Sequence, residues 1–529
     1  MNKAQNTFHP DTFSGNLKSK ILGAFILFFL LSAGAFLRFN DLSAPLLDFH
    51  PTRQLFGAIK ARGIYYQTLS ELAPVPAIVP VLAGPQGTVP AWQKDLAVRQ
   101  YASEATIEPP LMEHITAALY SRFGEQTAIP RALSASFWLI GALFVILLSK
   151  NLRSGSMTHP SWGASIASLA FYLLIPYAVT ASRSFQPDPL MVSLIVIFWW
   201  SIENWGRHPS WKWTIISGVT GGLAVFVKLP AAFFVIGGAI GAIMAHRGLV
   251  QSLKLPQTWG LVLLGFLPPA AYLYYGIFMN GFLGQQFGSR FYPEMWIDPF
   301  FYLRWFLKLE NVANVLWIAL AITSWLFFAS KPSKIFLASL WTAYLIYGMT
   351  FAHHISSHDY YSLPMIPIIA ISLAPLAAEM FALLQSKLKG SRSLQAISLA
   401  VLLITISLIS IDQYITQRTN DFRPQAAFWA TVSNATNHQP GVVALTTDYA
   451  YPLAYYGWQN AELWPLAPDI LNFDRAFARL TKTKSYFLIT DFDEYDRQPN
   501  LQKQLADNYP VLAQGKGYII FDLLHPFKK

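Results

Sequence analysis

The sequence contains no cysteine among its 529 residues, and only 12 % of its residues are charged. The absence of cysteine excludes disulfides, thiolate metal sites and a cysteine nucleophile. The scarcity of charge is accompanied by 53 % hydrophobic residues and a mean hydropathy of +0.35, which is more apolar than an ordinary soluble domain. The chain is therefore predicted to be a polytopic α-helical membrane protein.

The charged residues that are present give a formal net charge of +10. Lys and Arg are scattered in short stretches between apolar runs, and no long basic tract is interleaved with aromatic residues. A nucleic-acid partner is therefore not expected. Membrane topology explains the excess of positive charge better, because Lys and Arg gather in cytoplasmic loops.

Eleven segments are apolar and long enough to be membrane helices, which need roughly 20 residues to cross about 30 Å of hydrocarbon. They lie near residues 20–38, 131–149, 161–181, 189–204, 213–228, 230–246, 258–278, 313–330, 335–351, 361–384 and 394–411.

The distribution of positive charge between these segments predicts the topology. Alternate connections carry Lys or Arg, which places them and the N-terminus in the cytoplasm. An odd number of spans then places the segment 40–130, the loop 279–312 and the C-terminus outside the cytoplasm. We expect a bacterial inner (plasma) membrane protein. The stretch "SAGAF" resembles a signal-peptidase site, but the apolar run before it is long, so we expect an uncleaved anchor.

Two regions outside the membrane remain. Residues 40–130 contain the helical patterns "TRQLFGAIKARGIYYQ" and "LMEHITAALYSRFG", which are expected to lie at the membrane interface with their apolar faces on lipid. The tail alternates β-rich runs ("GVVALTT", "SYFLITD", "GYIIFDL") with helical stretches, which predicts a small extracytoplasmic α/β domain. We therefore divide the chain into a transmembrane domain, 1–411, and a C-terminal domain, 412–529.

Charged and polar residues close to the membrane are costly and are candidates for function. In this chain they cluster at the extracytoplasmic ends of the predicted helices, where separate loops can line one polar cavity. Carboxylates there can act as a general base, and cations can hold phosphate. The candidates are Asp41, Asp48, His50, Arg53, Glu108, Arg183, Asp188, Lys228, Arg290, His353, His354, His358, Asp359, Tyr360 and Tyr361.

Five stretches resemble, in order, the signatures of the GT-C superfamily of integral-membrane glycosyltransferases, which includes protein O-mannosyltransferases and lipid A aminoarabinose transferases. "LRFNDLSAPLLDFHPTRQ" is similar to the family's Arg, apolar, then Asp pattern after the first span, and "IEPPL" with "YSRFGEQTAIPRALS" resembles the stretch that leads into the second span. "FQPDPLM", "FVKLP" and "HDYYSLPMIP" match later signatures. Many relatives have Asp-Glu where this chain has Asp48-Phe49-His50, so no second acidic residue follows the aspartate here.

The resemblance implies a GT-C fold and an inverting enzyme that moves a hexose or pentose from a polyprenyl-phosphate donor to an extracytoplasmic lipid, glycan or protein. It implies that Asp48 is the general base. Residues expected to contact or support the acceptor are His50, Glu108, Asp188, His358 and Asp359. Those expected to hold the donor phosphate are Arg53, Lys228, Arg290, Tyr360 and Tyr361. No metal ligands are assigned, and dependence on a divalent metal stays open.

Each candidate also has a plain structural explanation. Asp48 could cap the helix that begins near Thr52, and Asp41, the rival base, lies in a turn-forming stretch. Asp188 could cap the fourth span. The stretch "EPP" at Glu108 could have a purely structural role, which is to redirect the chain. His50 and Arg53 could be surface residues that face lipid headgroups.

Lys228 and Arg290 could extend to the interface, and the two tyrosines could belong to an aromatic belt. The three histidines could bind metal, but at their spacing only part of the trio would share a helical face.

Two other function classes are open. A transporter or flippase of lipid-linked glycans would need charges at the bilayer midplane and, often, inverted repeats, and the sequence shows neither. A structural assembly factor would account for the C-terminal domain but not for the polar residues at the helix ends.

Overall fold

The computed structural model describes residues 17–72, 88–105, 107–151, 162–284, 291–328, 330–388 and 391–527. The chain forms two compact units. The first contains Met1–Asn40, Ala135–Ser182 and Asp188–Thr416. The second contains Asp41–Ser134, Arg183–Pro187 and Gln417–Lys529. The segment after the first helix thus groups with the C-terminal residues, and the predicted division at residue 411 stays a prediction.

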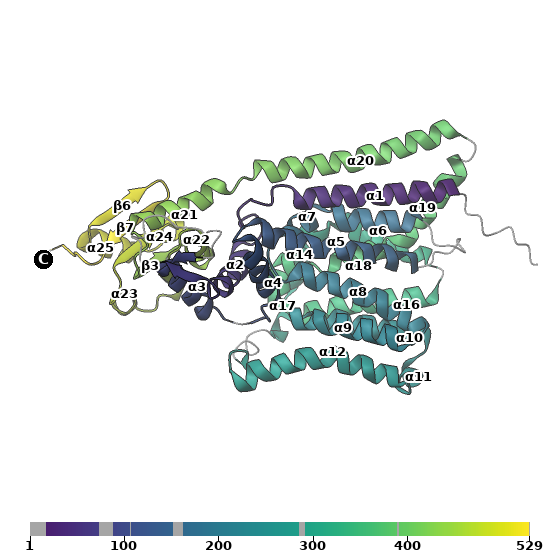
Figure 1. Ribbon diagram of the computed structural model, residues 1–529, viewed down its shortest axis with the longest axis horizontal. Helices are drawn as coiled ribbons and strands as arrows, with labels where there is room; N and C mark the ends of the chain where they lie inside the picture. The colour runs from purple at the N-terminus through teal and green to yellow at the C-terminus, as the bar shows by residue number, and fades with distance from the viewer. Residues whose placement is uncertain are drawn as a thin grey trace, which may run out of the picture. The chain divides into compact units, whose positions relative to one another are not determined.

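The first unit is a bundle of helices (Figure 1). Its helices are α1 (Leu17–Phe39), α5 (Ala128–Asn151, which begins in the second unit), α6 (Trp162–Leu174), α7 (Pro176–Arg183, whose last residue belongs to the second unit), α8 (Asp188–Arg207), α9 (Trp211–Val227), α10 (Ala231–His246), α11 (Leu249–Leu253), α12 (Pro256–Tyr274), η2 (Tyr275–Met279), η3 (Pro293–Ile297), α14 (Pro299–Ala313), α15 (Val315–Thr323), η4 (Ser324–Phe327), α16 (Lys331–Thr350), α17 (Ala352–Ser357), η5 (Asp359–Ser362), α18 (Met365–Ser372), α19 (Ala374–Leu388) and α20 (Arg392–Thr419, whose last residues belong to the second unit).

Small residues let these helices approach closely. Helices α9 and α12 lie side by side (Figure 1), and a Cβ added to Gly222 of α9 would lie 2.5 Å from the carbonyl oxygen of Leu264 in α12. Close backbone approach at glycine is typical of helix packing in membranes. Helices α8 and α9, α10 and α16, and α1 and α6 also pack against one another.

Each predicted span overlaps at least one helix, but spans such as 161–181 and 361–384 cover more than one, and fewer helices meet the length and composition expected of a span. Five described helices are long and apolar enough to cross a membrane, or up to seven if each of two bent pairs is one span. Helices α9 and α10, with 17 and 16 residues, are shorter than the roughly 20 residues that a span needs. The count of eleven membrane spans therefore stays a prediction.

The stretch expected to be a loop, 279–312, contains a helix that the sequence reading missed. Helix α14 begins after Asp298, whose side chain accepts a hydrogen bond from the backbone N–H of Phe300 at 2.9 Å. Pro299 at the first helical position supports the same start. Helix α14 meets α15 at a bend of 88°.

The second unit surrounds a helix that the sequence reading placed on lipid. Its elements before residue 134 are α2 (Pro51–Tyr66), β1 (Ser70–Leu72), β2 (Thr88–Pro90), α3 (Ala91–Ser103) and α4 (Leu111–Phe123). Helix α2 packs against α3, α4 and α22 (Tyr451–Tyr456), and most of its residues are buried. The apolar side chains of α2 therefore pack on protein.

Buried Arg62 joins α2 to the C-terminal residues of the same unit. Its Nε lies 2.8 Å from Oε1 of Glu125, and its Nη1 donates to the carbonyl of Tyr455 at 2.8 Å. The guanidinium also lies 3.8 Å from the ring centroid of Tyr455 and 4.1 Å from that of Trp458. These contacts explain why residues far apart in sequence form one unit.

The tail contains a five-stranded sheet in the order β4-β3-β5-β7-β6. Strands β4 (Ala461–Leu463), β3 (Val442–Leu445) and β5 (Tyr486–Ile489) are parallel, and β7 (Tyr518–Asp522) and β6 (Val511–Gly515) are antiparallel to their neighbours. The three β-rich runs noted in the sequence are β3, β5 and β7.

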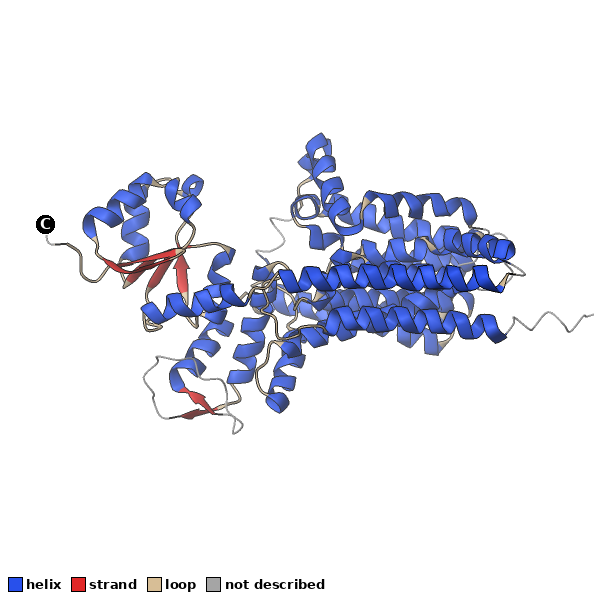
Figure 2. Cartoon of the chain, turned by 90° about the horizontal axis from the view of Figure 1, so that it is seen from above, coloured by secondary structure: helices blue, strands red, loops and turns tan. Residues whose placement is uncertain are grey.

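Helices cover both faces of this sheet (Figure 2). Alternate strand residues point to opposite sides: Val443 and Phe487 pack with α23 (Phe473–Thr481) and α25 (Pro499–Asn508), and Ala444 and Leu488 pack with α21 (Arg423–Ala435) and α22. The short helix α24 (Phe492–Asp496) follows β5. Burial on both faces explains why these strands are continuous apolar runs.

Candidate functional site

Asp48 is held by a buried arginine in the second unit. Arg131 Nη1 donates to Oδ2 of Asp48 at 2.9 Å, and Arg131 Nη2 donates to Oδ1 at 2.8 Å. The Arg131 side chain is fully buried, whereas the side chain of Asp48 is 19 % exposed. Such a two-point arginine–carboxylate pair fixes the position and the orientation of the carboxylate.

The same arginine also shapes the turn that carries Asp48. Its Nε donates to the carbonyl of Ala44 at 3.0 Å, and its Nη2 donates to the carbonyl of Pro45. Asp48 does not cap α2, because His50 occupies the N-cap position with a φ of 44° and without a capping hydrogen bond from its side chain. The capping explanation for Asp48 is therefore wrong.

The carboxylate of Asp48 has room for one further hydrogen bond. Its Oδ1 accepts from Arg131 and also from Nε2 of Gln54 at 3.2 Å, whereas among the described residues Oδ2 accepts from Arg131 alone. A carboxylate oxygen can accept two hydrogen bonds. Burial raises the pKa of Asp48, but Arg131 outweighs burial, and the pKa lies below its usual value. Asp48 is therefore ionised at neutral pH.

Asp41, the rival base, is paired differently. Its carboxylate forms ion pairs with Arg423 and, at 3.8 Å, with Arg418, and it accepts from Ser43 at 3.2 Å. Its backbone has a φ of 46°, in the left-handed region that short polar residues tolerate in turns. Asp41 thus links its turn to the end of α20 and to the start of α21.

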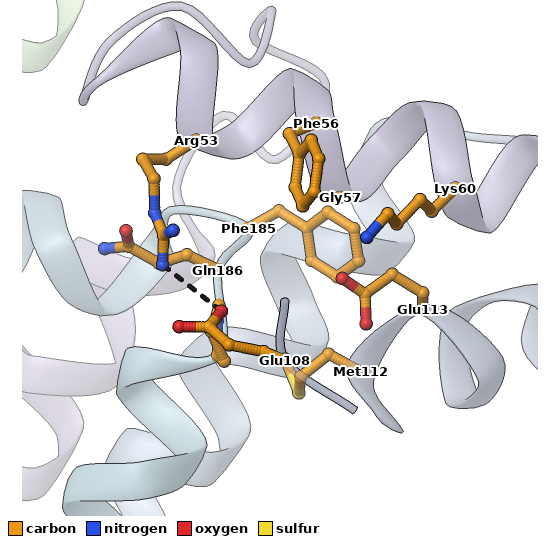
Figure 3. A pocket seen from close by; sticks show the side chains of 10 residues that line it. Arg53, Phe56, Gly57, Lys60, Glu108, Met112, Glu113, Phe185 and Gln186 are labelled. Carbon is orange, nitrogen blue, oxygen red and sulfur yellow. Dashed lines mark hydrogen bonds and ion pairs between the residues drawn. The ribbon is translucent and has the colours of Figure 1, made fainter. Parts of the chain in front are cut away.

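A narrow pocket lies between α2, α4 and the turn 185–187 (Figure 3). Arg53 and Glu108, both predicted from the sequence, line it and form an ion pair, with Arg53 Nη2 3.4 Å from Glu108 Oε2. The remaining lining residues are Phe56, Gly57, Lys60, Met112, Glu113, Phe185, Gln186 and Pro187.

Two charged residues of this pocket were not predicted from the sequence. Lys60 is 2 % exposed, and its Nζ donates to the carbonyl of Ala105 at 2.8 Å and lies 3.8 Å from the ring centroid of Phe56. Figure 3 shows the ends of the Lys60 and Glu113 side chains pointing toward one another, away from the Arg53–Glu108 pair. Burial raises the pKa of the Glu113 carboxyl to about 7 and lowers that of the Lys60 ammonium. A carboxyl that titrates near neutral pH is characteristic of functional sites.

Gln54 connects the pocket with Asp48. Its Nε2 donates to Asp48 and to the carbonyl of Phe49 at 2.8 Å, and its Oε1 accepts from the backbone N–H of Phe185 at 3.1 Å. Phe185 lines the pocket. One buried amide side chain therefore separates the pocket wall from the Asp48 carboxylate.

In the first unit, Lys228 and Asp188 form a buried ion pair. Lys228 Nζ lies 2.8 Å from Asp188 Oδ1, and the two side chains are 6 % and 1 % exposed. The same Nζ lies 5.3 Å from the ring centroids of Tyr360 and Tyr361, which are also buried. Extension of Lys228 to the interface and an exposed aromatic belt are therefore excluded, and four predicted residues do come together.

Side chains of the histidine-rich segment in the first unit contact neighbouring polar residues. Helix α17 carries His353 and His354, and His358 and Asp359 follow it. Asp359 Oδ2 accepts from Asn311 at 2.8 Å, and His358 Nδ1 lies 2.8 Å from Ser357 Oγ. Within the described ranges, no group of three or more His, Cys, Asp or Glu side chains is arranged to hold a metal. Arg290 lies outside the described residues.

Comparison with known proteins supports the family resemblance. Residues 108–275, about a third of the chain, match the sequence model of dolichyl-phosphate-mannose-protein mannosyltransferases. No curated protein matches the sequence closely enough to count as a relative. The fold is similar to that of ArnT from Cupriavidus metallidurans bound to undecaprenyl phosphate, with a TM-score of 0.56, 13 % identity, and coverage of 96 % of this chain and 98 % of that one. This chain has the GT-C fold.

A second solved structure agrees. The archaeal oligosaccharyltransferase AglB from Archaeoglobus fulgidus, in complex with an inhibitory peptide and a dolichol-phosphate, matches with a TM-score of 0.50 and 10 % identity, over 96 % of this chain and 74 % of that one. At these identities the likeness establishes the GT-C fold and not the substrate. Members of the GT-C superfamily transfer sugars from polyprenyl-phosphate-linked donors.

Arg131 was the main residue that the sequence reading missed. It lies in the first turn of the apolar helix α5, where a cation is disfavoured both by burial and by the helix dipole. That double cost signals a nearby carboxylate, although it does not say which one. Glu113 offered a weaker signal, because an acid in the first turn of α4 is ordinary.

Proposed function

We propose that the protein is an inverting glycosyltransferase that moves a hexose or pentose from a polyprenyl-phosphate carrier to an extracytoplasmic acceptor. The observation that supports this most is the Asp48 carboxylate, which is held in place by Arg131 and has one oxygen with room for a further hydrogen bond, within a GT-C fold. An inverting transfer needs one fixed carboxylate to accept the proton of the attacking hydroxyl.

In this proposal Oδ2 of Asp48 accepts a hydrogen bond from the acceptor hydroxyl. As the acceptor oxygen bonds to the anomeric carbon, its proton passes to Asp48, and the bond between that carbon and the lipid phosphate breaks with both electrons on the phosphate oxygen. The lowered pKa keeps Asp48 ionised before the reaction. Arg131 keeps the oxygen aimed, which is the positioning that such catalysis needs.

Positive charge is needed where the phosphate leaves. We assign this role to Lys228, which would exchange Asp188 for the lipid phosphate, with Tyr360 and Tyr361 next to its ammonium group. Arg290 is a second candidate on sequence grounds. Arg53 is paired with Glu108, so a phosphate would have to displace a carboxylate there. The roles of His50, His358 and Asp359 toward the acceptor, and any use of a divalent metal, stay predictions.

The test uses purified full-length protein in lipid nanodiscs with radiolabelled polyprenyl-phosphate sugar. We expect free polyprenyl phosphate and a labelled acceptor, whereas a flippase would leave the donor intact. Asp48→Asn should lower turnover by roughly 10²–10⁴, the contribution typical of general-base catalysis. Asp41→Asn is the matched control, since Asp41 is also paired with arginines, and it should retain most activity. Near-normal turnover by the Asp48 variant would contradict its role as the base.

Loss of the Asp48 charge leaves buried Arg131 uncompensated, so low turnover alone could reflect misfolding. The double variant Asp48→Asn/Arg131→Gln removes both charges and should melt closer to the parent protein while remaining inactive. Recovery of activity in the double variant would show that Asp48 acts only by neutralising Arg131.

We also propose that the C-terminus lies outside the cytoplasm, in agreement with the distribution of Lys and Arg along the sequence. A reporter that is active only in the cytoplasm should be silent when fused after Lys529. Strong reporter activity would reverse the proposed orientation and place Asp48 on the wrong side for a lipid-linked donor.

A further inference from the structure

A larger cavity of the second unit has no role in the mechanism above. It lies between α3 and the first residues of strands β3 and β4, and we call it the α3 cleft. Its volume is about 590 Å³, whereas the pocket beside Arg53 has about 10 Å³, which is room for one water molecule. Small-molecule sites typically occupy roughly 300–1,000 Å³, so the α3 cleft can hold a ligand of more than one ring.

Two aromatic rings form part of its wall. The partly exposed rings of Trp92 and His438 pack with their centroids 5.2 Å apart. Both ring nitrogens of His438 are engaged, Nδ1 with the carbonyl of Gly457 at 2.9 Å and Nε2 with the side chain of Asn434 at 3.1 Å. Trp92 also packs edge-on against buried Trp458, with the centroids 6.3 Å apart. The two rings are therefore held in fixed positions.

Side-chain amides line the same cleft. Asn437 and Gln439 are exposed, and among the described residues no hydrogen bond engages their side chains. Oδ1 of Asn460 accepts from Nε2 of Gln100 at 2.7 Å, while the described part of the chain offers no partner to its Nδ2 group. An amide side chain can both donate and accept, so these three residues suit hydroxyl groups.

The charged groups of the cleft already have partners. Nζ of Lys484 lies 2.8 Å from Oε2 of Glu462, and Nη2 of Arg99 lies 2.7 Å from Oδ2 of Asp95. An anionic ligand would meet a carboxylate beside each cation, and a lipid chain would remove charged and amide groups from water at high cost. The α3 cleft therefore favours a neutral polar ligand.

The backbone around the cleft has an unusual shape that other residues hold in place. Asn437 and His438 have φ values of 50° and 54°, and Trp458 has a φ of 51°, which is an outlier for a bulky residue. Buried Gln459 fixes the loop before β3, because its Nε2 donates to the carbonyl of Gln439 at 2.9 Å. Backbone strain of this kind clusters at sites that hold ligands.

An extended peptide fits these observations less well. Peptides often add a strand to a free sheet edge, and β4 is the edge strand beside the cleft. With three residues, β4 offers few backbone groups to a further strand. A sugar ring, in contrast, presents hydroxyl groups at its rim to the amides and C–H groups on its faces to the aromatic rings.

We propose that the α3 cleft is a binding site for a neutral oligosaccharide. The rings of Trp92 and His438 supply the surface on which sugar rings pack, and the side-chain amides supply the hydrogen bonds. Asp48 does not line the cleft, so this site goes beyond the proposed transfer. Both lie in the second unit, so a glycan bound here is held by the unit that carries the proposed base.

Direct binding to full-length protein in nanodiscs tests the proposal. The probes are cellotriose, maltotriose and chitotriose, followed by saturation-transfer NMR, with a neutral hexapeptide of Ala and Thr and glycerol phosphate as competing classes. We expect at least one trisaccharide to bind, and Trp92→Ala should weaken this binding about tenfold, since it removes most of the aromatic surface. Binding of the peptide or of glycerol phosphate alone, or of no probe, would overturn the carbohydrate assignment.

Trp92→Ala also removes packing against Trp458, so a variant without this side effect is needed. Gln439→Ala removes an exposed amide and should weaken trisaccharide binding severalfold, the loss typical of a neutral hydrogen bond, with an unchanged melting temperature. Gln514→Ala is the matched control, because Gln514 is an exposed glutamine on β6 outside the cleft. Parent-like affinity in both cleft variants would place the sugar elsewhere and refute the site.

The Asp48→Asn variant separates the cleft from the proposed active site. The trisaccharide should bind this variant with the affinity of the parent protein, even where sugar transfer is lost. Loss of trisaccharide binding in Asp48→Asn would assign the bound sugar to the active site and overturn the cleft. Sugar transfer that persists in Asp48→Asn would instead contradict the proposed base and leave the cleft standing.

Discussion

Two ion pairs among the candidate functional residues differ in exposure and not in distance. Arg131–Asp48 in the second unit and Lys228–Asp188 in the first unit both have a nitrogen–oxygen separation of 2.8 Å. The Asp48 side chain is 19 % exposed, whereas that of Asp188 is 1 % exposed. Part of the Asp48 side chain is therefore accessible while its ion pair is intact. The Lys228–Asp188 pair is almost completely closed to solvent.

The cations differ as well. The guanidinium of Arg131 contacts both oxygens of Asp48 and two backbone carbonyls, so it fixes a geometry. The ammonium of Lys228 contacts one oxygen of Asp188 and lies beside two tyrosine rings, so it can turn toward a new anion with less rearrangement. These contacts favour positioning by the first pair and exchange of partner by the second.

The largest effect on stability is expected from Lys228→Met. This variant leaves the Asp188 carboxylate buried without its ammonium partner, and loss of one member of a buried pair typically costs about 3–5 kcal/mol. Thermal and chemical denaturation in nanodiscs measure the loss. Lys331→Met, at an exposed position on α16, is the control and should be nearly neutral. A loss below about 1 kcal/mol would show that water reaches Asp188.

The double variant Lys228→Met/Asp188→Leu separates stability from donor binding. Replacing a buried ion pair by apolar residues is often neutral or stabilising, so the free energy of unfolding should largely recover. Donor binding should stay weak, because the proposed partner of the lipid phosphate is still missing. Full recovery of donor binding would assign Lys228 to structure alone.

Arg131→Gln should have a smaller effect on stability, about 1–3 kcal/mol, because Asp48 is partly exposed and can be hydrated. Arg131 lowers the pKa of Asp48, so the variant should raise that pKa. The stability that ionised Asp48 contributes is present above its ordinary pKa and is lost as pH falls, and the variant lacks this contribution. The acidic limb of the pH–turnover profile should move to higher pH. An unmoved limb would mean that another group limits the rate in acid.

The sequence predicted local elements better than the partners within the site. Each expected span overlaps one or more helices because long apolar runs are a local property. Lys228, Asp188, Tyr360 and Tyr361 were predicted individually, and the structure brings them together. The pairing of Arg131 with Asp48, 83 residues apart, depends on tertiary packing that no local pattern encodes.

The charged residues of the pocket could also not be predicted from the sequence, for a physical reason. Glu113 and Lys60 lie on helices that look amphipathic, and amphipathic helices pack equally well on lipid or on protein. The structure packs α2 on α3, α4 and α22, and this burial gives Glu113 its raised pKa. Gly57 looks like an ordinary helical glycine until the ring of Phe185 is placed beside it.

The smallest effect, and a test independent of activity, is the pH dependence of Glu113→Gln. Burial raises the pKa of Glu113 from 4.5 to about 7, so the folded protein binds this proton more tightly than the unfolded chain. Stability should therefore fall as pH rises from about 4.5 to 7, which is the opposite of the behaviour of Asp48. Gln stays neutral throughout, so the variant should match the parent protein at pH 4 and melt higher at pH 8. Each kcal/mol corresponds to roughly 2–4 °C in a unit of this size, so we expect a rise of a few degrees. Equal melting temperatures at pH 8 would mean that water reaches the Glu113 carboxylate in the folded protein.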